Sequence, residues 1–167
     1  MSPILNYCSE VCGFVNDLSI ERVHLQFCKK ILGVKKSTQN DFIYGELGRV
    51  SFKTVHLLNI IKYWLKILQL SSNKYVSISY AMLKDDLEQH ENRRNWCSML
   101  KDLLCSLGFV DAWVYKGVGN DNMFLNLAKQ RHTDQFIQNW NSRLSNSSRA
   151  LFYKSISSLN FSHILKV

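Results

Sequence analysis

One stretch, which begins at Ser51, has the clearest helical pattern of the chain and limits the fold most strongly. Its apolar residues recur at the i, i+3, i+4 spacing that gathers side chains on one face of a helix. The predicted buried stripe consists of Leu57, Ile60, Ile61, Trp64, Leu65 and Leu68. The predicted opposite side consists of His56, Asn59, Lys62, Lys66 and Gln69. The stretch therefore predicts a two-faced helix that covers a core and has a basic outer surface.

The rest of the chain also has helical spacing. Ser19 is a predicted N-cap of a helix that ends at Gly33, with Val23, Phe27 and Ile31 on one face. Further helices are predicted over 41–47, 75–88, 91–107, 120–144 and 148–156. The predicted apolar side of the 75–88 helix is Ile78, Met82 and Leu83. The candidate core of the 120–144 helix is Phe124, Leu127, Ala128, Phe136, Ile137, Trp140 and Leu144.

No convincing strand alternation is present, and Pro3 is the one proline of the sequence. The pattern of residues 3–15 fits either a strand or a short helix. We therefore predict a mainly α fold, a bundle-like domain of about six to seven helices, with room for a short N-terminal extended segment.

The 167 residues are 46% hydrophobic and 20% charged, which is typical of a globular chain rather than a disordered or membrane-embedded one. The most apolar segment, LLNIIKYWLKILQL, is interrupted by Lys62 and Lys66. No secretory signal is visible, and the five cysteines have no disulfide-like spacing. These features predict free thiols and an intracellular location, in the nucleus or cytoplasm.

Positive charge is concentrated in one part of the chain. The sequence has 21 basic and 13 acidic residues, a formal charge of +8 and a pI near 9.3. From Arg22 to Lys66, the sequence contains nine basic residues but only two acidic ones, Asp41 and Glu46, which is a local excess of seven positive charges. Such asymmetry favours a polyanionic partner, nucleic acid before membrane, although a basic face that only keeps the protein soluble is the simpler interpretation.

Two residue pairs resemble halves of a zinc site, Cys8 with Cys12 and His24 with Cys28, each four residues apart. Zinc needs four such donors, and thiols in an apolar context more often serve as small core residues. We therefore predict no metal and no cofactor.

A catalytic site is not predicted either. Asp85 and Asp86 lie in the helical context MLKDDLE, whereas metal-dependent phosphoryl transfer needs paired carboxylates on a tight hairpin. The segment GVGND lacks the lysine of a phosphate-binding loop. Aromatic residues next to basic ones, as in Lys62-Tyr63-Trp64 and near Trp96, could stack on bases, but the periodicity places both tryptophans on buried faces.

Several phrases occur together and in order: SEVCGF, IERVHLQFCKKILGVKKST, YGELGR, IIKYWLKIL, SLGF and KQRHTDQFIQNWNSRL. Together they resemble the C-terminal end of non-LTR (LINE-type) retrotransposon endonuclease–reverse transcriptases. The resemblance runs from about Pro3 to Tyr153 and is most specific over 21–38 and 44–49. Where this chain has Cys8 and Cys12, the family typically has Gly and Trp, which removes family support for zinc.

The resemblance implies that the chain begins after the polymerase palm. Residues 1–70 would then be a thumb-like basic helical segment and residues 71–167 a C-terminal helical segment, together one compact unit. Both the catalytic aspartates and the endonuclease would lie upstream, so the expected fragment is not an enzyme. Its expected partners are RNA or DNA backbone and the missing palm, without a membrane.

The sequence thus favours a non-catalytic nucleic-acid-binding fragment that contacts phosphates without reading base sequence. The candidate contact residues are Lys29, Lys30, Lys35, Lys36, Arg49, Lys53, Lys62 and Lys66. One alternative is a helical protein–protein interaction module with an incidental basic face. Another is a relic open reading frame without selected function.

Overall fold

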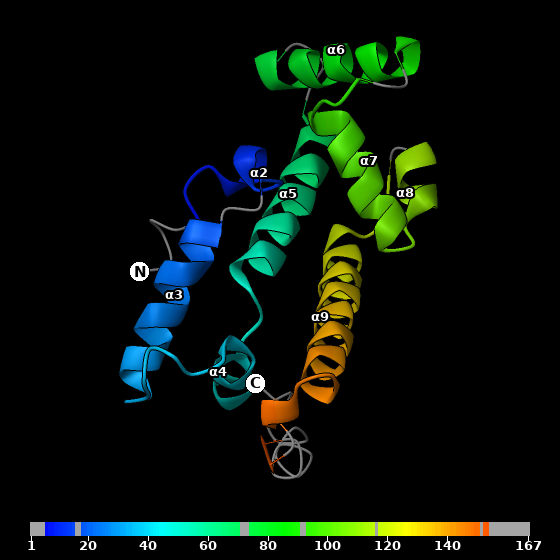
Figure 1. The fold of residues 1–167 in the computed structure, drawn as a ribbon. Coiled ribbons are helices and arrows are strands. Elements are labelled where there is room, and N and C mark those ends of the chain that lie inside the picture. The colour runs from blue at the N-terminus through cyan, green and yellow to red at the C-terminus, as the bar shows by residue number, and fades with distance from the viewer. Residues whose placement is uncertain are drawn as a thin grey trace. The chain divides into compact units, whose positions relative to one another are not determined.

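A computed structural model describes residues 6–15, 18–70, 74–90, 93–115, 117–150 and 152–153 of the chain, and the regular structure in these ranges is entirely helical. The mainly α prediction is confirmed (Figure 1). The α-helices of these ranges are α2 (Ser9–Cys12), α3 (Leu18–Ile31), α4 (Asn40–Leu47), α5 (Phe52–Leu68), α6 (Tyr75–Gln89), α7 (Trp96–Ser106), α8 (Val110–Val114) and α9 (Asp121–Ser145). A 3₁₀ turn, η1 (Ser148–Ala150), follows α9.

The chain forms two compact units, and each is built from two separate stretches. The first unit comprises Met1–Asn16 and Val55–His132, and the second comprises Asp17–Thr54 and Thr133–Val167. Two of the three boundaries fall inside helices, at 54/55 in α5 and at 132/133 in α9. Each unit thus takes residues from both predicted segments, 1–70 and 71–167, and the thumb-like role of the first segment stays a prediction.

The core of the first unit is built on the predicted stripe of α5. Ile60, Ile61 and Trp64 are fully buried, and Leu57 and Leu65 are nearly so. They pack with buried leucines of α7, with Phe109 and with Phe124 and Ala128 of α9. The apolar spacing that predicted this helix therefore also predicted most of the core.

One residue on the opposite side of α5 departs from the prediction. His56 is 9% exposed rather than open to solvent. The short helix α2 lies over it, because a Cβ placed on Gly13 would come within 3.0 Å of the His56 Cβ. Nearby, the Asn59 amide donates a 2.9 Å hydrogen bond to Ser9 Oγ. The ambiguous N-terminal stretch is helical over Ser9–Cys12, and this helix covers part of a face that looked solvent-exposed.

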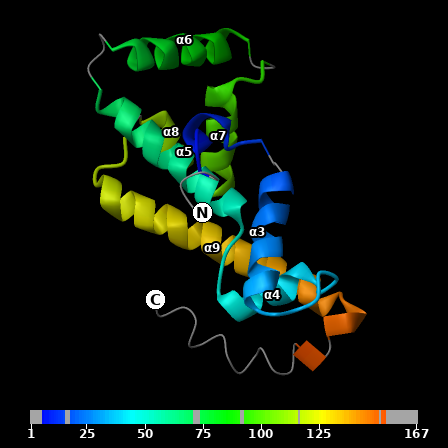
Figure 2. The same ribbon diagram turned by 90° about the vertical axis from the view of Figure 1, so that its left-hand side faces the viewer.

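Helix α6 lies across the ends of α5 and α7 within the first unit (Figure 2). Its predicted apolar side is wrong in two of three residues, because Ile78 is 44% and Met82 67% exposed. The side that faces α7 instead carries Tyr80 and Leu83, and no residue of α6 is fully buried. Helix α6 is thus attached by a polar and aromatic side rather than by its most apolar one.

Helices α7 and α9 begin at asparagines that accept backbone hydrogen bonds. Asn95 forms a reciprocal capping box with Ser98 at the start of α7, and Asn120 Oδ1 accepts the Met123 N–H at 3.0 Å.

The predicted core of α9 is largely confirmed, with Leu127 as the exception at 42% exposure.

In the second unit, α3 and α4 pack together through Leu25, Cys28 and Ile43. The predicted stop of α3 is confirmed, since Gly33 has a left-handed φ of 66° and the Val34 N–H bonds back to the Lys29 carbonyl at 3.1 Å. The face that carries Val23, Phe27 and Ile31 is the exposed one, and the buried face is the more polar side with His24 and Cys28.

The end of α9 closes the second unit against α4. Trp140 Nε1 donates a 2.7 Å hydrogen bond to the Asp41 carbonyl, and Arg143 binds the Asp41 carboxylate at 2.9 Å. Gly45 leaves the room for this contact: a Cβ there would lie 2.9 Å from the Trp140 ring and would clash with the Tyr153 hydroxyl. A glycine inside a helix lowers stability by about 1 kcal/mol relative to alanine. We therefore attribute the glycine at position 45 of α4 to the close packing that it permits.

Three further predictions fall partly or wholly outside the described residues: the break at 71–73, the first residues of the 3–15 stretch, and most of the 148–156 helix, of which η1 is described. Among the helices of the described ranges, none is long and apolar enough to cross a membrane.

Candidate nucleic-acid interface

Six of the eight predicted contact residues lie in the second unit. Lys29 and Lys30 occupy the last turn of α3, and Lys35 and Lys36 follow Gly33. Lys29 Nζ donates a 3.0 Å hydrogen bond to the Lys36 carbonyl, which ties the turn to the end of the helix. The other two, Arg49 and Lys53, flank the start of α5 and are exposed.

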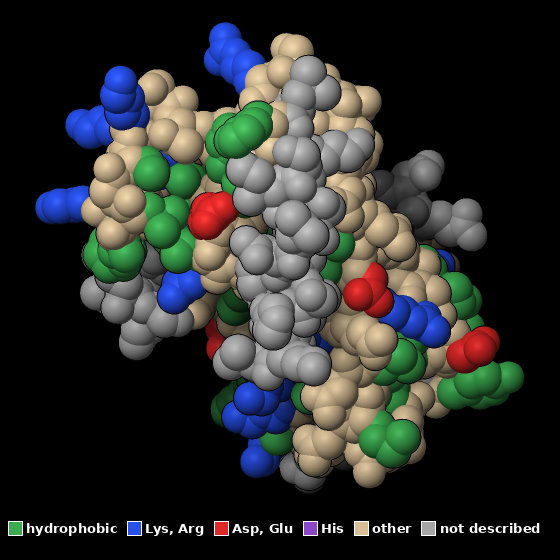
Figure 3. Space-filling model, turned by 90° about the horizontal axis from the view of Figure 1, so that it is seen from below, with side chains coloured by type: hydrophobic (Ala, Val, Ile, Leu, Met, Phe, Trp, Pro, Cys, Tyr) green, Lys and Arg blue, Asp and Glu red, His purple; other side chains and the backbone are tan. Residues whose placement is uncertain are grey.

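The remaining two contact residues, Lys62 and Lys66, lie in the first unit, one helical turn apart on the exposed side of α5. Among the residues that the structure describes, none of the eight forms an ion pair within 4.0 Å. Figure 3 shows Lys and Arg side chains at several places on this face, several of them extending outward at its edges.

Two carboxylates of the second unit's N-terminal stretch, Glu21 and Asp41, are engaged within the protein, whereas Glu46 is exposed. Glu21 accepts hydrogen bonds from the Tyr44 hydroxyl at 2.6 Å and from the Phe52 N–H at 2.8 Å. Asp41 pairs with Arg143, and a hydrogen bond between Glu46 and the Tyr153 hydroxyl contributes to raising the tyrosine pKa, after burial. Because Glu21 and Asp41 are engaged internally, the exposed described charges of this stretch are mostly basic, with Glu46 as the exposed acid.

His24 and Cys28 do lie together, but as buried neighbours. Their closest N and S atoms are 3.6 Å apart, and the His24 ring packs edge-on against Phe52 at 4.6 Å between centroids. Burial lowers the pKa of His24 and raises that of Cys28, and the nearby Arg49 lowers both. The described residues contain no group of three or more His, Cys, Asp or Glu side chains that could hold a metal ion.

The second cysteine pair is exposed on α2, with the Cys8 and Cys12 sulfurs 3.8 Å apart. The hydrogen-bonded neighbour Cys12 raises the pKa of Cys8.

The aspartate pair on α6 has a structural partner. Asp86 binds Arg93 at 2.7 Å and also accepts from Asn95, and the Arg93 hydrogen bond holds its pKa below the usual value. Asp85 is exposed. Asp86 thus fastens the connection between α6 and α7.

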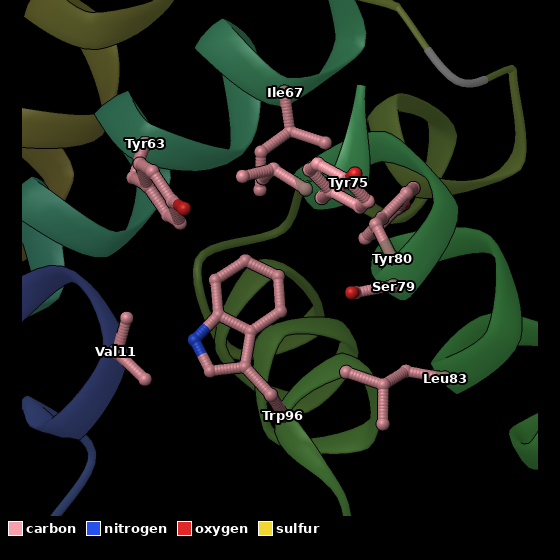
Figure 4. A pocket seen from close by; sticks show the side chains of 9 residues that line it. Val11, Tyr63, Ile67, Tyr75, Ser79, Tyr80, Leu83 and Trp96 are labelled. Atoms are coloured by element: carbon pink, nitrogen blue, oxygen red, sulfur yellow. The ribbon is translucent and has the colours of Figure 1, made fainter. Parts of the chain in front are cut away.

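A pocket of about 320 Å³ in the first unit was not predicted from the sequence (Figure 4). It lies between α2, α5, α6 and α7. Its lining contains four aromatic side chains, Tyr63, Tyr75, Tyr80 and Trp96. It also contains Ser79 and four aliphatic side chains, Val11, Ile67, Val76 and Leu83. Trp64 is fully buried as predicted, whereas Trp96 is only partly buried and faces this pocket. This pocket could not be predicted from sequence spacing, because it depends on where α6 lies across its neighbours.

No protein-family model, curated protein or solved structure matches this chain.

Proposed function

We propose that this chain binds nucleic acid through its basic side chains, which contact backbone phosphates without reading base sequence. The observation that carries the proposal is the cluster of six exposed or partly exposed basic residues in the second unit: Lys29, Lys30, Lys35, Lys36, Arg49 and Lys53. Their charges are not paired within the described part of the chain, while Glu21 and Asp41 of the same stretch are engaged internally.

The resemblance of YGELGR and its flanks to non-LTR reverse transcriptases supports the finer proposal of a non-catalytic, post-palm fragment. In that proposal the nucleic acid is RNA or DNA held beside a polymerase domain, the second partner is that palm, and the protein is intracellular. The comparisons with known proteins add no support to this assignment.

Binding of the purified chain to RNA and to duplex DNA across salt concentrations tests the proposal. Each phosphate neutralised lowers the slope of log K against log salt by about 0.9 on duplex DNA. The double variant Lys35→Glu, Lys36→Glu should weaken binding and flatten the slope by about two units. The matched control is Lys101→Glu, Lys129→Glu, which makes the same charge change at two exposed lysines of the first unit. Absence of binding at low salt, or equal losses in both double variants, would contradict the proposal.

One observation favours the alternative of an interaction module. Helix α3 carries an exposed apolar row, with Val23 at 51%, Phe27 at 39% and Ile31 at 62% exposure. If the basic face is incidental, Lys35→Glu, Lys36→Glu should leave the function intact, whereas Phe27→Ser should remove it. The flanking genomic sequence separates both candidates from a relic, because stop codons directly upstream would favour the relic.

A further inference from the structure

We propose that the aromatic pocket of the first unit receives one unpaired base of a single-stranded nucleic acid. Lys62 and Lys66 would then hold the neighbouring phosphates. This inference rests on the proposed function and adds to it a preference for single strands. It also gives a role to two basic residues that lie outside the six-residue cluster of the second unit.

The lining suits a flat, apolar ring. Trp96 lies near the centre of the pocket, with Tyr63 on one side and Tyr80 on the other (Figure 4). Both tyrosine rings stand nearly perpendicular to the indole, at 88° and 82°, with centroids 6.3 and 6.4 Å away. Among the described rings that line the pocket, none is stacked parallel on Trp96. Bases stack on such side chains irrespective of sequence.

The polar groups of two pocket rings already have partners, so the rings are fixed in place. Trp96 Nε1 donates a 3.2 Å hydrogen bond to the Glu10 carbonyl. The Tyr80 hydroxyl accepts one from Trp64 Nε1 at 3.1 Å. Ser79 extends its hydroxyl toward the space between the rings, where it can bond to a base edge (Figure 4). Preorganised rings lose little conformational entropy when a ligand binds.

Size and charge favour a base over a larger apolar partner. A volume of about 320 Å³ is at the lower end of small-ligand pockets, which span roughly 300–1,000 Å³. On α5, Lys62 and Lys66 directly precede the lining residues Tyr63 and Ile67, and Lys74 directly precedes Tyr75. The α6 segment 75–83 carries no charged residue, and Glu10, beside Val11, is the acid next in sequence to a lining residue on α2. A neutral ring with phosphates on its flanks matches this distribution.

The test compares two single strands of equal length and charge, a dT 12-mer and the same sugar–phosphate chain without bases, by fluorescence anisotropy at low salt. One stacked base should strengthen binding about 5- to 150-fold, the range that corresponds to typical stacking energies. Tyr75→Ala and Ser79→Phe, which remove a lining ring and fill the space, should abolish this preference but keep the salt dependence. Tyr75 is 90% exposed, so its loss should not affect folding.

Tyr115→Ala, at an equally peripheral tyrosine of the first unit, is the matched control and should keep the preference. Equal affinity for the two strands, with the salt slope intact, would overturn the pocket assignment and leave the proposed function standing. Retention of the preference in both pocket variants would also overturn it. If neither strand binds at low salt, the inference fails, and the proposed function fails with it if RNA and duplex DNA do not bind either.

Discussion

At the scale of single residues, the side chains that hold the second unit together are polar ones. Glu21, in the first turn of α3, reaches Tyr44 on α4 and the first backbone N–H of α5 with its two carboxylate oxygens. Burial and this hydrogen bond raise the pKa of Tyr44, so the phenol remains a donor at neutral pH. One carboxylate therefore connects three helices.

Glu21→Ala should destabilise the protein by about 1–3 kcal/mol, because it leaves a partly buried hydroxyl and a backbone N–H without their acceptor. Urea unfolding followed by circular dichroism measures the loss. Glu88→Ala removes an exposed acid that pairs only with Lys84 one turn away, and it should change the free energy of unfolding by less than about 1 kcal/mol. Similar losses in the two variants would show that Glu21 is not a structural tie.

His24 should make stability depend on pH. Burial lowers its pKa in the folded state, with Arg49 acting in the same direction and Glu21 opposing, while Cys28 lies against the ring. The unfolded chain therefore takes up this proton first, near pH 6.5. The contribution of neutral His24 is fully present above that pH and is lost as the pH falls below it.

Unfolding free energies at pH 7.5 and 5.5 test this expectation. The wild type should lose more stability between the two values than His24→Gln does, since glutamine does not titrate. An equal pH dependence in His24→Gln and in the wild type would contradict the assignment.

At the scale of elements, the motif YGELGR has a structural explanation. Tyr44 binds Glu21, Gly45 leaves room for Trp140, and Gly48 ends α4 with a left-handed φ of 57°. Arg49 and Glu46 are the exposed charged residues of the motif. The motif that carries the family resemblance therefore specifies packing more than phosphate contact.

The start of α7 offers a test at this scale. Asn95→Ala removes the cap of the helix and also the hydrogen bonds from the Asn95 amide to the Leu83 carbonyl and to Asp86. The expected loss is about 1–2 kcal/mol in the free energy of unfolding. Asn126→Ala, in the exposed face of α9, serves as the control and should be nearly neutral. A neutral Asn95→Ala would mean that the cap does not limit stability.

Helix positions were predictable because the apolar spacing and the glycine stops are local signals. The stripe of α5 and the ends at Gly33, Gly48 and Gly108 needed no tertiary information. Which face is buried was less predictable where two faces compete. In α3 the burial of His24 depends on Glu21, Arg49 and Phe52, which come from separate turns and helices. Individual basic residues were predictable as exposed, but their division between two units was not.

At the scale of the whole molecule, the described parts of the two units differ in core size. Among the described residues, the first unit buries thirteen in one apolar cluster, whereas the two clusters of the second unit bury three each. Each unit contains one buried cysteine, Cys97 in the first and Cys28 in the second. These thiols can report separately on the opening of each unit.

Reaction with a thiol reagent under native conditions should therefore show three classes. The exposed Cys8, Cys12 and Cys105 should react within the first phase. Cys28 should follow, and Cys97 should be slowest, because burial raises its pKa to about 11 and the larger core opens less often. The single variants Cys28→Ser and Cys97→Ser assign the two slow phases. A Cys97 that reacts as fast as Cys8 would contradict the described burial.

Gly45 has a consequence for how this sequence can change over generations. A side chain at this position can be accommodated only if both the Trp140 ring, 95 residues further along the chain, and the Tyr153 hydroxyl move or are replaced. Substitutions of Gly45 should therefore occur together with changes at positions 140 and 153 in descendant sequences.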